Sequence, residues 1–172
     1  AGNGEDYRGY IDEALQSFAD LGFQVEVLDI SACDRETAQA KIFQSKLLYI
    51  SGGNTFYLLQ ELKKKQLLSL IKEQIADGMV YVGESAGAVI TAEDIDYIRL
   101  MDDKEVAGEL SDTVALKVAD FYLLPHVGEE PFAESAQAIL NTYGDKLNLL
   151  PLNNRQAVLV EDEKVKVLVE NK

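Results

Sequence analysis

Residues 80–87 read VYVGESAG, an apolar run followed at once by a Gly-x-Ser-x-Gly pattern. The apolar run predicts a buried strand, and the small residues after Ser85 predict the start of a helix. A serine at a tight turn between a strand and a helix, with glycines on both sides, is typical of a nucleophile elbow. Such a turn lifts the hydroxyl of Ser85 above the end of the strand. We therefore expect Ser85 to be a nucleophile; the alternative is a turn in which Ser85 only caps the helix.

The alternation of strand and helix extends over the whole chain. Apolar residues in alternating or continuous runs predict strands over residues 23–27, 47–50, 79–82 and 121–124. Apolar spacing and end signals predict helices over residues 7–21, 35–44 (capped by Asp34), 56–64, 67–77 and 131–144. This order indicates an α/β fold with a mostly parallel sheet between helix layers. Residues 157–160 and 165–169 predict a C-terminal β-hairpin, and the absence of a linker predicts a single domain over residues 1–172.

The sequence contains one histidine, His126, at the end of the predicted strand 121–124. A serine nucleophile needs a base, and histidine is the usual one because imidazole exchanges its proton near neutral pH. The carboxyl ends of parallel strands line the ligand crevice of such sheets, so Ser85 and His126 are expected to face the same crevice. The base is then His126 or a residue of another chain. The alternative is that a lone histidine is structural.

A third group should orient the imidazole. Nine acidic residues lie between Ser85 and His126, and their spacing does not choose among them. Most of them are expected to be solvated surface charges. They are Glu93, Asp94, Asp96, Asp102, Asp103, Glu105, Glu109, Asp112 and Asp120.

A second motif, GGNT at residues 52–55, follows the predicted strand 47–50. Two adjacent glycines let the backbone approach a ligand closely, and their N–H groups can point into the crevice. The alternative is a simple turn capped by Asn54 or Thr55. The motif is not a phosphate-binding loop, because no Gly-Lys-Ser/Thr follows it.

Composition and charge limit the classes of partner. The 172 residues are 47% hydrophobic and carry a net charge of −14, which suits a well-cored, acidic protein. Such a surface repels phosphate backbones and anionic lipid, so binding to nucleic acid or to a membrane is not expected. The single cysteine, Cys33, excludes an intrachain disulfide and suits the cytoplasm. One histidine and one cysteine far apart cannot build a zinc site, so no metal is expected.

Three motifs together, GGNTF at 52–56, GESAGA at 83–88 and Pro125-His126, resemble the peptidase E family of serine peptidases. That family includes the aspartyl dipeptidases and, more distantly, the cyanophycinases. The resemblance runs from about residue 7 to the final hairpin. It implies a three-layer α/β fold of the class I glutamine-amidotransferase-like, flavodoxin-like kind. It also implies a cytoplasmic monomer or homodimer that hydrolyses small peptides without a metal or an organic cofactor.

Carried over residue by residue, the resemblance implies a complete serine-peptidase site. The catalytic residues would be Ser85 as nucleophile, His126 as base and Asp103 as acid, with Asp102 as the alternative acid. The other members would be the N–H groups of Gly53 and Ala86 as the oxyanion hole, and Asn54 and Thr55 as substrate-binding residues.

The chain departs from the family pattern in two places. Family members begin with a strand, a helix and a second strand, which we expect this sequence to lack. Aspartyl dipeptidases also carry an arginine after the catalytic histidine that pairs with the substrate aspartate. Residues 127–140 contain no arginine or lysine here, and contain Glu129, Glu130 and Glu134 instead. A strong preference for N-terminal aspartate is therefore not expected.

Two other functions fit parts of the sequence. An esterase of the α/β-hydrolase type shares the elbow, but it has more residues between serine and histidine and a glycine-rich oxyanion loop that follows another histidine. A catalytically inactive, amidotransferase-like binding or sensor domain would share the fold. The presence of Ser85, His126 and both glycine motifs disfavours that alternative.

Overall fold

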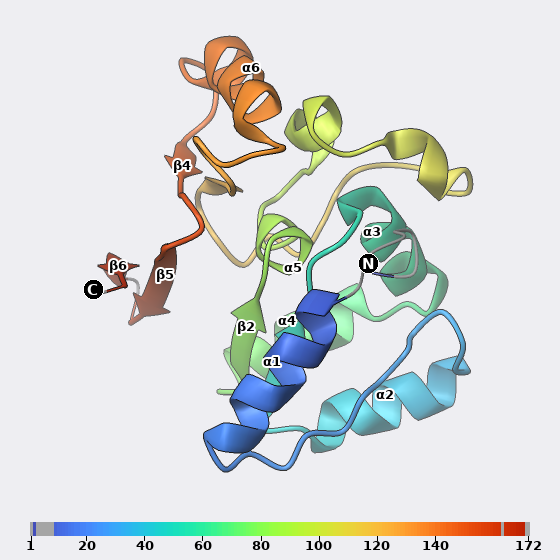
Figure 1. The fold of residues 1–172 in the computed structure, drawn as a ribbon. Coiled ribbons are helices and arrows are strands. Elements are labelled where there is room, and N and C mark those ends of the chain that lie inside the picture. The colour runs from blue at the N-terminus through green and yellow to red at the C-terminus, as the bar shows by residue number, and fades with distance from the viewer. Residues whose placement is uncertain (1, 3–8, 163, 171–172) are drawn as a thin grey trace.

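The computed structural model describes residues 2, 9–162 and 164–170, and helices and strands are interspersed along the chain up to a C-terminal run of three strands (Figure 1). The helices are α1 (Gly9–Asp20), α2 (Arg35–Gln44), α3 (Thr55–Lys64), α4 (Leu68–Ala76), α5 (Ala86–Val89) and α6 (Ala133–Tyr143), with the 3-10 helices η2 (Asp96–Leu100) and η3 (Lys104–Ala107). The strands are β1 (Leu47–Ile50), β2 (Val80–Gly83), β3 (Tyr122–Leu124), β4 (Leu149–Pro151), β5 (Gln156–Glu161) and β6 (Lys164–Val169). The α/β fold class is confirmed.

The strands form three two-stranded ladders within the described residues, where we expected one mostly parallel sheet. β1 and β2 are parallel, with Ile50 opposite Gly83. β3 and β4 are also parallel, with Leu124 opposite Pro151. β5 and β6 are antiparallel. The short helix α5 follows β2 and contacts both β1 and β3, so it joins the two parallel pairs through packing.

Most predicted elements form, and the exceptions have a physical cause. Asp34 caps α2 as predicted, since its carboxylate accepts from the N–H of Thr37 at 2.7 Å. The strand predicted over residues 23–27 is wrong. In the described part of the chain no strand pairs with this segment, and Val27 keeps 62% of its surface exposed. The alternating pattern therefore lacks the neighbour that would bury one face. β4, η2 and η3 were not predicted.

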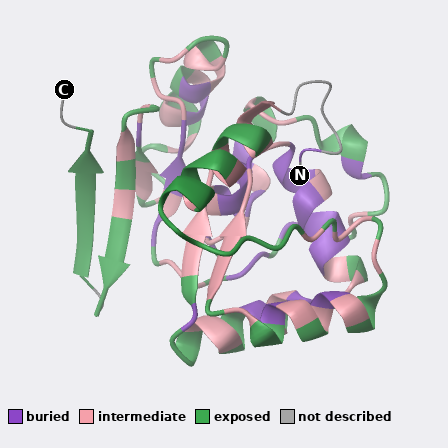
Figure 2. Ribbon diagram, turned by 60° about the horizontal axis from the view of Figure 1, so that its bottom comes forward, coloured by how far each residue is buried: buried purple, intermediate pink, exposed green. Residues whose placement is uncertain are grey.

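The core gathers around α3, whose apolar residues are almost completely buried (Figure 2). Phe56 and Leu59 are inaccessible to solvent and belong to the same cluster as Ile71 of α4 and Ile90 after α5. Burying each such side chain contributes about 1.5–3 kcal/mol to folding. α3 begins at Thr55, five residues after β1 ends at Ile50. Because α3 is anchored in this cluster, the short connection restricts the position of the carboxyl end of β1.

β1 lies between this core and α1, because its side chains alternate between two faces. Leu48 and Ile50 pack against the core cluster. Tyr49 points to the other side, where its ring meets that of Phe18 of α1 edge-on at 5.1 Å between centroids. β1 is thus covered on both faces, which explains its continuous apolar sequence.

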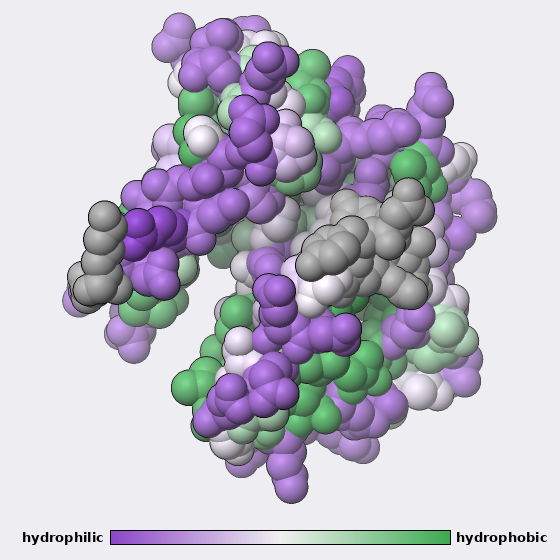
Figure 3. All heavy atoms as spheres, viewed as in Figure 1, coloured by the Kyte–Doolittle hydropathy of each residue, from purple (hydrophilic) through white to green (hydrophobic). Residues whose placement is uncertain are grey.

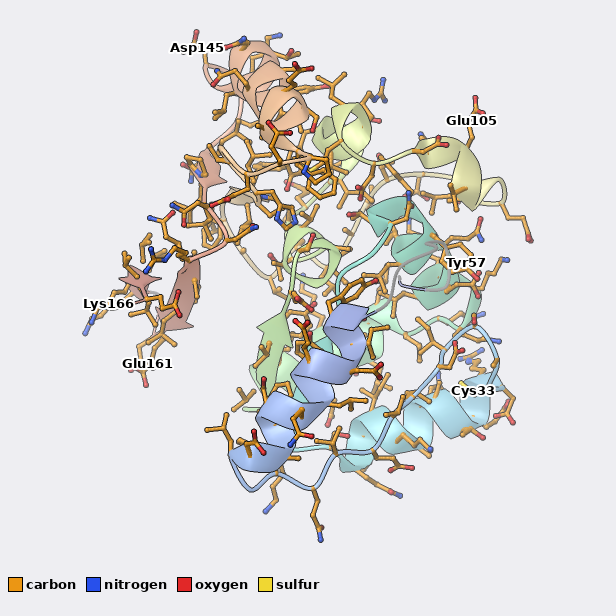
Figure 4. The ribbon with its side chains drawn as sticks, in the orientation of Figure 1. Cys33, Tyr57, Glu105, Asp145, Glu161 and Lys166 are labelled. Atoms are coloured by element: carbon orange, nitrogen blue, oxygen red, sulfur yellow. The ribbon has the colours of Figure 1, made fainter. Side chains whose placement is uncertain are left out.

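The outer parts of the molecule are more polar and more exposed. Every residue of β6 is exposed, and Figure 4 shows Glu161 and Lys166 on the hairpin, away from the helical body that carries Cys33 and Tyr57. On the face drawn in Figure 3, hydrophobic residues gather over the region of α1 and α2, and much of the remaining surface is hydrophilic. None of the helices in the described part of the chain has the length and apolar character that spanning a bilayer requires.

Candidate active site

Ser85 lies at a sharp turn between β2 and α5, with φ 46° and ψ −107°. A positive φ is strained for a residue with a side chain, and such strain is a property of nucleophile elbows. Glycine is required on both sides, because a Cβ at Gly83 would overlap the backbone of Gly87 and one at Gly87 would overlap the carbonyl group of Ile50. The hydroxyl of Tyr81 donates to the carbonyl oxygen of Gly87 at 2.5 Å. This backbone conformation agrees with the tight turn that the sequence predicts around Ser85.

The glycine loop after β1 lies against this elbow. The register of β1 and β2 continues past the strand ends, where the N–H of Glu84 donates to the carbonyl of Ile50 at 3.0 Å. Gly53 has φ 120°, a conformation that favours glycine. Within the described residues, the N–H groups of Gly53 and Ala86 donate to no protein acceptor. Ala86 is buried, and a buried N–H without a protein partner is uncommon, which distinguishes this donor from the rest of the backbone.

His126 follows β3 and reaches the elbow. Its backbone also has a positive φ, 62°, and its Nε2 lies 2.9 Å from the Oγ of Ser85. The ring of Phe132 stacks on the imidazole, with 4.8 Å between centroids and 27° between planes. The backbone turn and the stacked ring both restrict the direction in which the imidazole points. The structure thus brings together the two residues that the sequence placed at separate strand ends.

The other nitrogen of His126 contacts a residue that the sequence analysis did not identify. Nδ1 lies 2.6 Å from the Oδ1 of Asn154. The pairing of β3 with β4 continues beyond the strands, because the N–H of Val127 donates to the carbonyl of Leu152 at 2.9 Å. This brings the loop after β4 beside His126. An oxygen opposite Nδ1 requires that nitrogen to carry the proton, so Nε2 is free to accept the hydroxyl proton of Ser85.

The structure does not place Asp103 on His126, and this corrects the acid that we expected. Its exposed carboxylate caps η3 by accepting from the N–H of Glu105 at 2.8 Å. Figure 4 shows Glu105 pointing outward from that turn. Asp102, the alternative acid, accepts from the N–H of Thr55 at 2.8 Å. Among the described residues, the hydrogen-bond partner of Nδ1 is the amide of Asn154, not a carboxylate.

Asn54 and Thr55 have their polar groups occupied within the protein. The Oδ1 of Asn54 accepts from the N–H of Tyr57 at 2.9 Å, and its Nδ2 donates to the carbonyl of Asp103 at 2.8 Å. Both Asn54 and Thr55 are buried. These contacts tie the start of α3 to the segment before η3. The hydrogen bonds of the two residues thus stabilise the end of the glycine loop, whereas we expected these residues to contact a substrate.

Two ionisable groups near the loop have shifted pKa values. Burial raises the pKa of the Asp102 carboxyl, and the hydrogen bonds from Thr55 and the charge of His126 oppose that shift. Burial also raises the pKa of the Tyr49 hydroxyl, and its hydrogen bond to Glu84 adds to the effect. Asp102 is therefore a carboxylate that lies within electrostatic reach of His126 without a hydrogen bond to it.

Arg99 and Arg155 are each paired with a carboxylate. The guanidinium of Arg99 forms an ion pair with Asp96. Arg155, the neighbour of Asn154, contacts the Oε2 of Glu170 at 3.3 Å through its Nε. Among the described residues, no group of three His, Cys, Asp or Glu side chains is arranged to hold a metal ion.

Comparisons of the sequence with known proteins identify a family of peptidases that resembles this chain. Residues 1–168 match the model of peptidase family S51. The uncharacterized peptidase PM1590 of Pasteurella multocida is 42% identical over 159 residues, which are 92% of this chain and 77% of that protein. A peptidase E of Shewanella sp. (strain W3-18-1) is 36% identical over 128 residues, which cover 73% of this chain and 50% of that protein.

A solved structure agrees with these sequence matches. The crystal structure of a Listeria monocytogenes EGD-e protein, described as a candidate peptidase E, superposes with a TM-score of 0.92 at 36% identity. The match covers 97% of this chain and 81% of that one. The resemblance to the peptidase E family is thereby confirmed. The chain belongs to peptidase family S51, and it is a peptidase.

Proposed function

We propose that this chain is a serine-type peptidase that hydrolyses short peptides, with Ser85 as the nucleophile and His126 as the base. The observation that carries the proposal is the 2.9 Å contact between the Oγ of Ser85 and the Nε2 of His126, made by a serine with a φ of 46°. A nucleophile and base within hydrogen-bond reach, with the base oriented by a third group, are the signature of nucleophilic catalysis. The free N–H groups of Gly53 and Ala86 support the same reading.

In the first step the Oγ of Ser85 attacks the scissile carbonyl carbon while Nε2 of His126 takes the hydroxyl proton. The carbonyl oxygen becomes negatively charged, and the N–H groups of Gly53 and Ala86 donate to it. The tetrahedral species then collapses: the C–N bond breaks and His126 returns the proton to the leaving amine. In the second step a water molecule, deprotonated by His126, attacks the acyl group on Ser85. The peptide acid leaves, and the hydroxyl of Ser85 regains its proton.

Asn154 takes the orienting role for which we had expected Asp103 or Asp102. Its Oδ1 accepts the proton of Nδ1 and so holds the imidazole in the tautomer that the first step needs. A neutral amide fixes this orientation but supplies no negative charge to the imidazolium that forms. An asparagine in this position also occurs in cysteine peptidases of the papain type. We infer that the amide of Asn154 serves here to fix the tautomer of His126.

The charges around the site favour substrates that lack an acidic first residue. A desolvated substrate carboxylate needs a cationic partner, and Arg99 is already paired with Asp96. The segment after His126 carries Glu129 and Glu130. The net charge of −14 adds a repulsive long-range field for anionic peptides. Neutral or basic peptides are therefore the proposed substrates.

Hydrolysis of Asp-X, Ala-X and Lys-X dipeptides tests this proposal, with products followed by mass spectrometry. We expect kcat/KM for Ala-X and Lys-X to exceed that for Asp-X, and we expect Ser85→Ala to hydrolyse none of them. The exposed serine of α4 provides a matched control, Ser69→Ala. A marked preference for Asp-X would contradict the specificity and direct attention to Arg99. Undiminished hydrolysis by Ser85→Ala would contradict the mechanism.

A further inference from the structure

The side chain of Glu84 has no part in the mechanism above, although it precedes Ser85 in the elbow. Glu84 is half-buried, and one of its carboxylate oxygens, Oε2, accepts two hydrogen bonds. One comes from the hydroxyl of Tyr49 of β1, and the other comes from the N–H of Gly52 at 3.4 Å. This single oxygen thus connects the elbow both to the end of β1 and to the glycine loop.

The carbonyl of Gly52 is held as well, so both peptide groups that flank Gly52 have a hydrogen-bonded anchor. The hydroxyl of Tyr10 of α1 donates to the carbonyl oxygen of Gly52 at 3.3 Å. In a trans peptide the C=O of one residue and the N–H of the next point in opposite directions. Whatever fixes the carbonyl of Gly52 therefore fixes the direction of the Gly53 N–H. This is the donor assigned above to the oxyanion.

The loop needs such anchors because of its composition. Two consecutive glycines have no Cβ to restrict their dihedral angles, so many orientations of their peptide groups are accessible. The loop also lies directly against the nucleophile, since a Cβ at Gly52 would sit 3.4 Å from the Cβ of Ser85. A small rotation of the loop would move the Gly53 N–H away from the oxyanion while leaving Ser85 and His126 in place.

We propose that Glu84 is a positioning residue of the oxyanion hole: its carboxylate holds the N–H of Gly52, and with Tyr10 on the carbonyl it aims the N–H of Gly53. The inference rests on the proposed function, because it assumes that Gly53 stabilises an oxyanion. Its effect is confined to the charged transition state. Ground-state binding of the peptide is therefore expected to change little when Glu84 is replaced.

Three variants of the full chain test this proposal: Glu84→Ala, Glu84→Gln and Tyr10→Phe. Glu84→Ala should lower kcat roughly 10- to 100-fold with KM almost unchanged, which is less than the loss from removing an oxyanion donor outright. Glu84→Gln should restore most of this loss, because the amide oxygen can accept from both Tyr49 and Gly52. Tyr10→Phe should lower kcat by a smaller factor. The matched control is Glu93→Gln, at an exposed ion pair with Lys117.

Binding of a peptide aldehyde, which forms a tetrahedral adduct with the nucleophile, separates a positioning role from a structural one. Its affinity should fall in Glu84→Ala by the same factor as kcat/KM, while the melting temperature stays near that of the unmodified chain. A rise in KM with unchanged kcat, or a kcat loss without a loss of aldehyde affinity, would overturn the proposal. If a fluorophosphonate fails to label Ser85 in the unmodified chain, the proposed function itself is wrong. Labelling of the unmodified chain and equally fast labelling of Glu84→Ala would refute only the role of Glu84.

Discussion

The two halves of the candidate site are built differently, although a pair of parallel strands supports each. The nucleophile half, on β1 and β2, is closely packed: Gly83 and Gly87 leave no room for a side chain, and Ala86 is buried. The base half, on β3 and β4, is more open, because His126 is half-buried and Asn154 is exposed. The comparison indicates that close backbone packing fixes the nucleophile, whereas the base is held at a more open position by one stacked ring and two side-chain contacts.

The largest effect should come from removing the contact that joins the halves. Ser85→Ala and His126→Ala should each lower kcat by several orders of magnitude, up to roughly 10⁶-fold. Because the two side chains act as one unit, kcat of the double variant should be no lower than kcat of the less active single variant. Steady-state kinetics on one dipeptide checks this. Losses that multiply in the double variant would show that Ser85 and His126 act independently.

The next effect concerns packing in the nucleophile half. Gly87→Ala should lower the free energy of unfolding by about 1–3 kcal/mol or more, because the new Cβ meets the backbone of Ile50. Gly108→Ala is the matched control: its φ is −59°, and a Cβ there would be 4.0 Å from the nearest atom. Urea denaturation followed by circular dichroism measures both variants. Equal stability of the two would mean that the elbow is not closely packed.

A smaller effect is expected in the base half, where Asn154 orients His126. Asn154→Ala should lower kcat/KM roughly 10- to 100-fold, less than loss of the base itself. Asn154→Asp keeps the acceptor and adds a charge that favours the protonated imidazole. The acidic limb of its kcat/KM profile should therefore move to higher pH. Asn141→Ala, an exposed asparagine of α6, serves as the control. A profile for Asn154→Asp that overlays the original would contradict this contact.

The smallest effect concerns stability against pH at Asp102. Because burial raises its pKa, the folded state holds this proton to higher pH than the unfolded state does. The free energy of unfolding therefore decreases as pH rises from the ordinary carboxyl pKa through the raised value, and the loss is complete above it. Asp102→Asn should remove that decrease while keeping an acceptor for Thr55. Urea denaturation from about pH 4 to about pH 7 measures the difference.

Asp112 provides a control of opposite sign for this measurement. The ion pair with Lys63 lowers the pKa of its carboxyl, so it stabilises the fold above the ordinary pKa and loses that contribution as pH falls. Asp112→Asn should therefore lose stability relative to the original chain as pH rises. The same slope in both variants would contradict the assigned pKa directions.

The same contrast explains how much could be predicted from sequence. The geometry of the nucleophile half could be predicted from the sequence, because only glycine fits at residues 83 and 87. The base half does not: Asn154 reaches His126 through the register of β3 and β4, and β4 is a three-residue strand that ends in proline. Recognising β4 would have offered a signal, since the residues after a parallel strand lie at the same edge as His126.

Two further limits of prediction came from neighbours that the sequence does not show. Residues 23–27 alternate like a strand but have no strand beside them in the described structure. Asp103 had the expected place in the sequence for a catalytic acid, but the N–H of Glu105 offered its carboxylate a local partner. Local hydrogen bonds of this kind compete with distant ones and are decided only by the folded chain.

Mass spectrometry after reaction with a fluorophosphonate tests the central claim most directly. The account predicts one phosphonyl group per chain, attached to Ser85, together with loss of peptidase activity. Ser85→Ala should take up none. His126→Ala should react much more slowly, because no base then activates the hydroxyl of Ser85. A label on another serine, or an unlabelled Ser85 in a folded and active chain, would contradict the assignment of Ser85 as the nucleophile.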